Sequence, residues 1–203
     1  MADSKKKLKV KKLTIGGLVY ALLFFGASEQ FEGSDSDNKC GGEELWEQKV
    51  LIDDSAALIN TQSEITSINK INAIPTEDEK RTKKKPRLSF EKQVVTVENV
   101  LIRKVILEDD NDYHLVVQDR MGNHLIAEIT DPECEDAQRS DFIDDYFKVR
   151  EMMEKHAEDF QHWEFDITGV LFKDRSHGQT GKADNNIEIH PVLKLKAVKL
   201  LNF

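Results

Sequence analysis

The fold is decided by the stretch VVTVENVLIRKVIL, residues 94–107. β-Branched residues dominate it, and such side chains lose rotamer freedom in a helix but pack well on a pleated sheet. The stretch therefore predicts a β-strand. It is long enough for the strand to bend and to serve two sides of a closed barrel.

Four further strands follow it along the chain. The segments 113–118 and 124–129 alternate in polarity, and the glycine in 119–123 between them suits a hairpin turn. The same alternation predicts a fourth strand at 164–173 and a fifth from Asn186 to about Lys196.

The segment between the third and fourth strands has a helical pattern. Its apolar residues within 136–160 recur close to helical spacing, with Ser140 or Asp141 as the expected start. Three strands, a helix and two strands is the order of the OB fold, a small five-stranded barrel whose closure hides its strand edges. We therefore expect a mainly β, OB-like barrel over 90–198. The alternative is another small antiparallel barrel or sandwich covered by a helix.

The N-terminus has the pattern of an export signal. A lysine-rich segment, 1–12, precedes an apolar run of 15 residues, 13–27, which ends in small residues. A membrane-spanning helix needs about 20 apolar residues. Residues 1–28 are thus predicted to be a cleaved signal peptide or, alternatively, an uncleaved membrane anchor, which would be the only membrane contact. Under either interpretation, the chain after residue 28 is exported to the periplasm, the cell surface or the exterior.

The net charge disfavours one class of partner. The first 28 residues contain six lysines and one aspartate, so the remaining chain carries a formal charge of −14. Affinity for nucleic acid depends on neutralising phosphates with basic side chains. Nucleic acid is therefore disfavoured as a partner, and an unknown extracytoplasmic ligand is expected instead.

The only two cysteines, Cys40 and Cys134, both lie in the exported part. An even number of cysteines outside the cytosol favours a disulfide. This one would tie the N-terminal region to the barrel, and the alternative is two unpaired thiols.

Residues 29–89 precede the predicted barrel. Small and polar residues predict a flexible tether at 29–42, and the lysine-rich composition of 77–89 predicts a charged linker. Between them, 43–76 is predicted to be an extension that packs on the core, with Trp46 as an anchor. Isoleucines that recur every three residues predict a short helix from near Glu64 to before Pro75.

Several polar residues on or beside the predicted strands form a candidate site. Glu188 and His190 alternate with isoleucines, so they share one face of a strand. Imidazole and carboxylate groups suit zinc or another divalent cation, and they also suit general acid and base catalysis. A third interpretation is a hydrogen-bonded cluster that ties loops to the barrel, with Asp112 beside it. The candidate cluster is His114, Glu128, Asp174, His177, Glu188 and His190.

A series of short motifs carries a resemblance across most of 40–195. In chain order the motifs are CG at 40–41, DDNDYHL at 109–115, IAEI at 126–129, TGV at 168–170, HGQTG at 177–181 and EIHPVL at 188–193. The chain resembles a set of exported bacterial proteins, usually left uncharacterised, that share the DxDYHL, IAEI, HGQTG and ExHPV motifs. The resemblance implies a shared exported domain and supports the grouping of the histidines and glutamates, but it transfers no activity. The chain departs from that set at Thr130, where the similar proteins tend to have proline.

No catalytic signature accompanies these residues. The chain lacks both Gly-x-Ser-x-Gly and His-Glu-x-x-His. We expect a binding or structural module of the cell envelope or exterior, with a divalent cation as a candidate cofactor. The alternative is a metal-dependent hydrolase, nuclease-like in type, that uses the His/Glu cluster; only analogy with other OB folds supports it.

Overall fold

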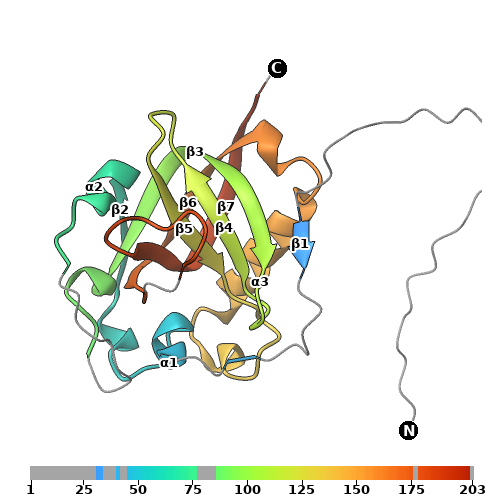
Figure 1. Ribbon diagram of the computed structural model, residues 1–203. Helices are drawn as coiled ribbons and strands as arrows, with labels where there is room; N and C mark the ends of the chain where they lie inside the picture. The colour runs from blue at the N-terminus through green and yellow to red at the C-terminus, as the bar shows by residue number, and fades with distance from the viewer. Residues whose placement is uncertain (1–30, 34–39, 42–44, 77–85, 176–177, 202–203) are drawn as a thin grey trace, which may run out of the picture.

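The computed structural model describes residues 31–33, 40–41, 45–76, 86–175 and 178–201 (Figure 1). Its strands are β1 Phe31–Gly33, β2 Asn60–Thr66, β3 Gln93–Leu107, β4 Tyr113–Gln118, β5 His124–Ile129, β6 Trp163–Lys173 and β7 Ile187–Leu200. Its α-helices are α1 Trp46–Lys49, α2 Ile68–Asn72 and α3 Ile143–Lys155. Short 3₁₀ turns occupy Ala56–Leu58, Phe90–Lys92, Ala137–Arg139 and Phe160–His162.

Five strands close into a barrel in the order β3-β4-β5-β7-β6, and β6 pairs back onto β3. The β5–β7 pair is parallel, and the other four pairs are antiparallel. Helix α3 lies in the chain between the third and fourth of these strands. The predicted OB-like fold is therefore confirmed.

Strand β3 serves both sides of the barrel, as its length predicted. Its first half pairs with β6 from Val94 to Val100, and its second half pairs with β4 from Leu101 to Leu107. The β6 register shifts beside Asn99, which has a φ of 54°. Asparagine tolerates this left-handed conformation better than a β-branched residue does. Asn99 thus lies where the strand bends between its two partners.

The core lies inside the barrel and is closed by α3. Inward-facing side chains such as Leu115, Ala127 and Ile189 are fully buried. Val149 and Met153 of α3 belong to the same cluster. Because successive residues of a strand point to opposite faces, the neighbours of these core residues lie on the outside of the barrel.

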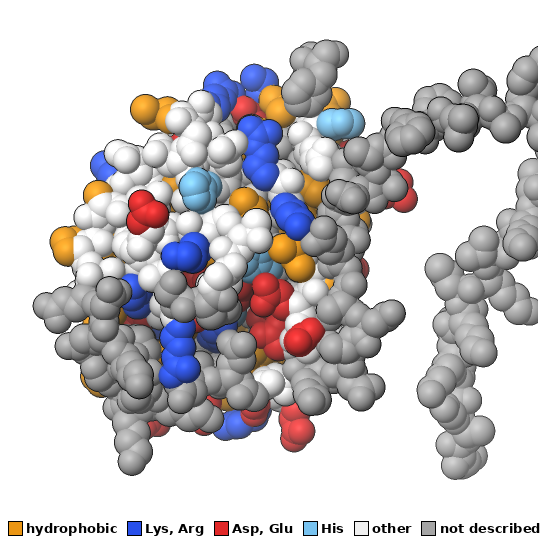
Figure 2. Space-filling view, in the orientation of Figure 1, with side chains coloured by type: hydrophobic (Ala, Val, Ile, Leu, Met, Phe, Trp, Pro, Cys, Tyr) orange, Lys and Arg blue, Asp and Glu red, His pale blue; other side chains and the backbone are white. Residues whose placement is uncertain are grey.

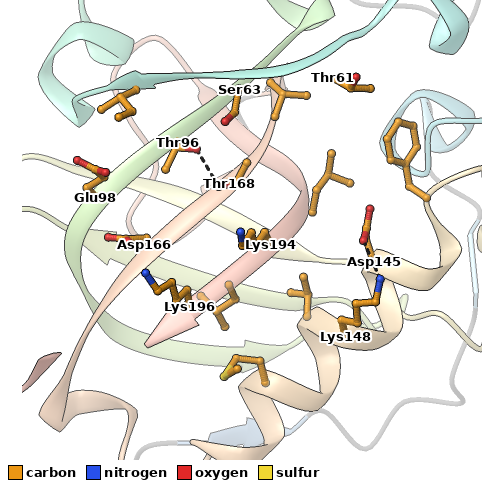
Figure 3. A pocket seen from close by; sticks show the side chains of 17 residues that line it. Thr61, Ser63, Thr96, Glu98, Asp145, Lys148, Asp166, Thr168, Lys194 and Lys196 are labelled. Atoms are coloured by element: carbon orange, nitrogen blue, oxygen red, sulfur yellow. Dashed lines mark hydrogen bonds and ion pairs between the residues drawn. The ribbon is translucent and has the colours of Figure 1, made fainter. Parts of the chain in front are cut away.

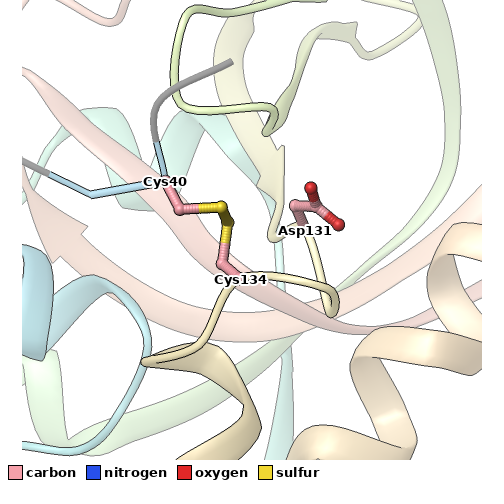
Figure 4. Close-up of side chains that lie close together, drawn as sticks. All are labelled: Cys40, Asp131 and Cys134. Atoms are coloured by element: carbon pink, nitrogen blue, oxygen red, sulfur yellow. A yellow bond between two sulfur atoms is a disulfide. The ribbon is translucent and has the colours of Figure 1, made fainter.

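The N-terminal extension is anchored on the outside of the barrel. Trp46 and Val50 pack with Cys134, Ala137 and Tyr146 in a second apolar cluster. Cys40 and Cys134 form the predicted disulfide, with 5.3 Å between their Cα atoms (Figure 4). Trp46 is only 5% exposed, which fits its predicted role in packing.

A helix was predicted to begin near Glu64, and this predicted start is wrong. Residues up to Thr66 form β2, which pairs in parallel with β3, and Ile65 is 70% exposed on it. The helix begins only after Ser67, whose side chain accepts a hydrogen bond from the Lys70 amide. Pairing with β3 therefore outweighs the isoleucine spacing up to this cap.

The remaining predicted segments are only partly described. Within the predicted tether, residues 31–33 form β1, which pairs in parallel with the end of β3. The predicted signal segment 1–28 and most of the linker 77–89 lie outside the described residues. Among the helices of the described ranges, none is both long and apolar enough to cross a membrane.

Loss of the disulfide should destabilise the protein. Cys40→Ser removes a cross-link between residues 94 positions apart, which allows the unfolded chain more conformations. We expect the free energy of unfolding to fall by about 2–4 kcal/mol. Urea unfolding of the wild-type protein and the variant measures this difference. A reductant should lower the wild-type stability and leave the variant unchanged; equal stability of the two oxidised proteins would contradict the prediction.

Candidate functional site

Four of the predicted site residues meet on the outer face of the barrel. His114 of β4 lies directly opposite Glu128 of β5 in the antiparallel ladder. Glu188 and His190 of β7 alternate with core isoleucines and lie beside β5. All four residues are at most 2% exposed. Their face is therefore covered, although it lies outside the barrel core.

The N-terminal extension and the β6–β7 loop cover this face. Lys49 of α1 places its Nζ 3.8 Å from Glu128 Oε2. Gly181 of the loop packs on β4 so closely that a Cβ there would lie 2.6 Å from Val116 Cγ1. The neighbouring Thr180 carbonyl accepts a hydrogen bond of 2.9 Å from His114 Nε2. Glycine at 181 therefore lets the loop close over the polar side chains.

His190 is surrounded by carboxylates. Its Nδ1 lies 2.6 Å from Glu128 Oε2 and 3.3 Å from Glu188 Oε1. Its Nε2 lies 3.4 Å from Asp112 Oδ2, and neither of these two atoms has a hydrogen-bond partner among the described residues. The other oxygen of Asp112 accepts a hydrogen bond of 2.8 Å from the Asp131 amide. The fixed Asp112 carboxylate therefore leaves one oxygen directed at an equally unsatisfied imidazole nitrogen.

His114 has a similar environment. Its Nδ1 lies 3.2 Å from Glu128 Oε1 and 3.1 Å from Glu108 Oε1. The two oxygens of Glu128 thus contact different histidines. Glu128 is the centre of the cluster, because it contacts both rings and Lys49.

Several carboxylates in the cluster are held in an unfavourable environment. Burial raises the pKa of Asp112. Burial, followed by repulsion from Glu128 and Asp174, raises the pKa of Glu188 to about 8. Burial and the nearby Asp112 raise the pKa of Asp110 to about 7. Burial thus disfavours the charged form of each carboxylate, and a nearby positive charge would favour it.

The remaining groups of the cluster ionise more readily than usual. Burial would raise the pKa of Glu128, but Lys49, His190 and His114 together lower it well below its ordinary value. Burial would lower the pKa of His114, but hydrogen bonds to Glu108 and Glu128 raise it to about 10. Burial opposes the charged form of His190 too, yet Glu128, Asp112 and Glu188 raise its pKa well above the ordinary value. Both rings therefore attract a cation, whether a proton or a metal ion.

The other predicted site residues are less central. Asp174 is buried at the end of β6, where Gln179 Nε2 donates a hydrogen bond of 2.9 Å to its Oδ2. His177 lies outside the described residues. The prediction did not include Lys49, Glu108 or Asp110, which the fold brings to the cluster. Glu108 and Asp110 belong to the acidic turn 108–112 beside Asp112, whereas no pattern singled out Lys49.

Two groups of the described residues could each hold a cation. One is Asp112, Glu128 and His190; the other is Glu108, His114 and Glu128. In each group the candidate ligand atoms lie within 4.8 Å of one another. Cys40, Asp131 and Cys134 lie equally close, but the two sulfurs are bonded to each other (Figure 4).

No protein-family model, curated protein or solved structure matches this chain.

A groove of about 810 Å³ lies on another part of the barrel surface (Figure 3). Strand β2 and helix α3 flank it, and residues of β3, β6 and β7 line it between them. Thr96 and Thr168 share a hydrogen bond of 2.8 Å there. Acidic and basic side chains are balanced among the lining residues, which include Glu98, Asp145, Asp166, Lys148, Lys194 and Lys196. The groove therefore offers hydroxyl groups and mixed charges rather than a surface of one sign.

Proposed function

We propose that this chain is an exported binding module of the cell envelope or exterior whose barrel is held together by a buried divalent cation. Asp112, Glu128 and His190 would bind the cation, and zinc is the first candidate because it accepts both imidazole and carboxylate ligands. The groove between β2 and α3 would be the surface offered to a ligand.

The observation that carries the proposal is the buried pair Asp112 Oδ2 and His190 Nε2, which lie at ion-pair distance from each other but make no hydrogen bond of good geometry. Buried polar atoms without a partner are costly and rare in native proteins. These two face each other across 3.4 Å, inside a group of candidate ligands that also includes Glu128. His190 Nδ1 contacts both Glu128 Oε2 and Glu188 Oε1, and its Nε2 faces Asp112 Oδ2. Metal-binding histidines characteristically have such a partner on the second nitrogen.

Burial favours a scaffold role for the cation over the metal-dependent hydrolase. A hydrolytic metal needs an open coordination position that substrate can reach. Asp112, Glu128 and His190 are each at most 2% exposed. A cation among them would stabilise the closed arrangement of β5, β7 and the turn before β4.

The disulfide supports the extracytoplasmic part of the proposal. A stable disulfide fits a non-reducing compartment such as the periplasm or the cell exterior. Export itself, by the predicted signal 1–28, remains part of the proposal. So does the shared exported domain implied by the resemblance described above.

Metal content tests the proposal directly. We expect the full chain, purified without a histidine tag from an oxidising compartment, to contain at least one equivalent of a divalent transition metal by plasma mass spectrometry. Asp112→Asn should lower the content by about one equivalent while keeping the acceptor for the Asp131 amide. The control Asp145→Asn, on the exposed α3 surface, should keep the full content. A metal-free wild-type protein whose melting temperature ignores both added zinc and chelator would refute the proposal.

A further inference from the structure

Glu128 contacts two histidines with two different oxygens. Oε2 lies 2.6 Å from His190, within the cation group of the proposed function, whereas Oε1 lies 3.2 Å from His114. The residues around Oε1 form the second group, Glu108, His114 and Glu128. One carboxylate therefore stands between two sets of cation ligands.

The hydrogen bond of His114 to Thr180 determines which ring nitrogen is available. A carbonyl oxygen can only accept, so Nε2 must carry the hydrogen of this 2.9 Å bond. In the neutral ring Nδ1 then has no hydrogen and carries a lone pair. This nitrogen nevertheless faces two carboxylate oxygens, Glu108 Oε1 at 3.1 Å and Glu128 Oε1 at 3.2 Å. A lone pair directed at two carboxylates is repulsive. A proton on Nδ1 or a metal ion between the three atoms removes this repulsion.

A metal ion fits this position better than a second proton. A single proton on Nδ1 points in one direction, but the two carboxylates lie at nearly equal distances from it. A metal ion accepts all three ligand atoms at once. The Thr180 carbonyl is also the kind of outer partner that fixes the tautomer of a metal-binding histidine.

We propose that Glu108, His114 and Glu128 form a second divalent-cation site, and that Glu128 bridges it to the buried one. The inference rests on the proposed function, since the bridge presupposes a cation beside Asp112 and His190.

The two sites differ in access to solvent. The side chain of Glu108 is 35% exposed, whereas those of Asp112 and His190 are 1% and 0% exposed. Figure 2 shows acidic side chains gathered at the surface over the end of β3, where the turn to β4 begins. This negative patch attracts cations toward the second site. The second ion should therefore exchange faster than the buried one.

Zinc stoichiometry tests this inference separately from the proposed function. The full chain is stripped with chelator and dialysed against buffered zinc, and bound metal is measured across a range of free zinc concentrations. We expect two equivalents for the wild-type protein and one for Glu108→Gln, which keeps the shape of the side chain but weakens the ligand. The control Asp109→Asn removes a charge from the same exposed turn and should keep two equivalents.

Each outcome separates the two proposals. Two equivalents in wild type that fall to one only in Glu108→Gln support the bridged pair. One equivalent in wild type, unchanged in Glu108→Gln, overturns the second site and leaves the buried site standing. A wild-type protein that binds no zinc overturns both proposals. Cobalt provides an independent readout, because the second equivalent should change the visible absorption of the wild-type protein but not that of Glu108→Gln. Identical cobalt spectra for the two proteins would also overturn the second site.

Discussion

Glu128→Gln should release both cations and lower the free energy of unfolding by about 3–5 kcal/mol. Glu128 is 2% exposed and contacts Lys49, His114 and His190. Glutamine preserves the volume of the side chain, so packing is retained, but it removes the negative charge that holds these three groups. They would remain buried without their common counter-charge, which is costly.

Urea unfolding followed by the fluorescence of Trp46 and Trp163 measures this loss, with metal content determined on the same samples. Glu64→Gln, on the exposed strand β2, is the matched control and should change stability by less than about 0.5 kcal/mol. The prediction fails if Glu128→Gln stays within about 1 kcal/mol of wild type and retains its metal. A loss of stability that persists in chelator would show that the charge network stabilises the fold without the ions too.

Most of the barrel could be predicted from the sequence because its strands carry strong local signals. The long β-branched run became β3, and the hairpin and the two later strands lie within a few residues of their predicted bounds. Helix α3 was expected to begin at Ser140 or Asp141, but it begins at Ile143. The Ser140 hydroxyl instead accepts a hydrogen bond from the Phe142 amide, which forms a turn just before the helix.

Part of the site also followed from the hairpin. Gln118 pairs with His124 next to the turn, and four residues further along each strand His114 pairs with Glu128. The turn therefore determines this pair once its register is known. Lys49 could not be predicted in this way, because it depends on where the N-terminal extension docks. That docking rests on contacts between distant residues, such as the disulfide and the packing around Trp46.

The metal-free protein should be most stable in mildly acidic solution and lose stability as the pH rises. His114 has a pKa of about 10 when folded, against an ordinary value of 6.5, and Glu188 has a pKa of about 8, against 4.5. Both folded-state values are raised, so the folded protein binds more protons than the unfolded chain. The stability from these groups is complete below the unfolded values and is lost as the pH rises through the folded ones.

Between pH 6 and pH 9 we expect the free energy of unfolding in chelator to fall by about 4–6 kcal/mol, because each such proton contributes about 1.4 kcal/mol per pH unit. Urea unfolding at several pH values measures this slope. Glu128 has the opposite dependence on pH. Its folded-state pKa is lowered, so the stability that it contributes is lost only as the pH falls below about 4.5. Stability that rises from pH 6 to pH 9 would contradict the prediction.

Bound metal should counteract this loss of stability. A metal ion and a proton compete for the same nitrogens and oxygens, so binding releases protons and the affinity for zinc rises with pH. The zinc-bound protein should therefore keep its stability at pH 9, where the stripped protein is weakest. The difference in melting temperature between the zinc-bound and chelated protein should be small at pH 6 and large at pH 9. A constant difference would mean that the cation binds away from His114, His190 and the buried carboxylates.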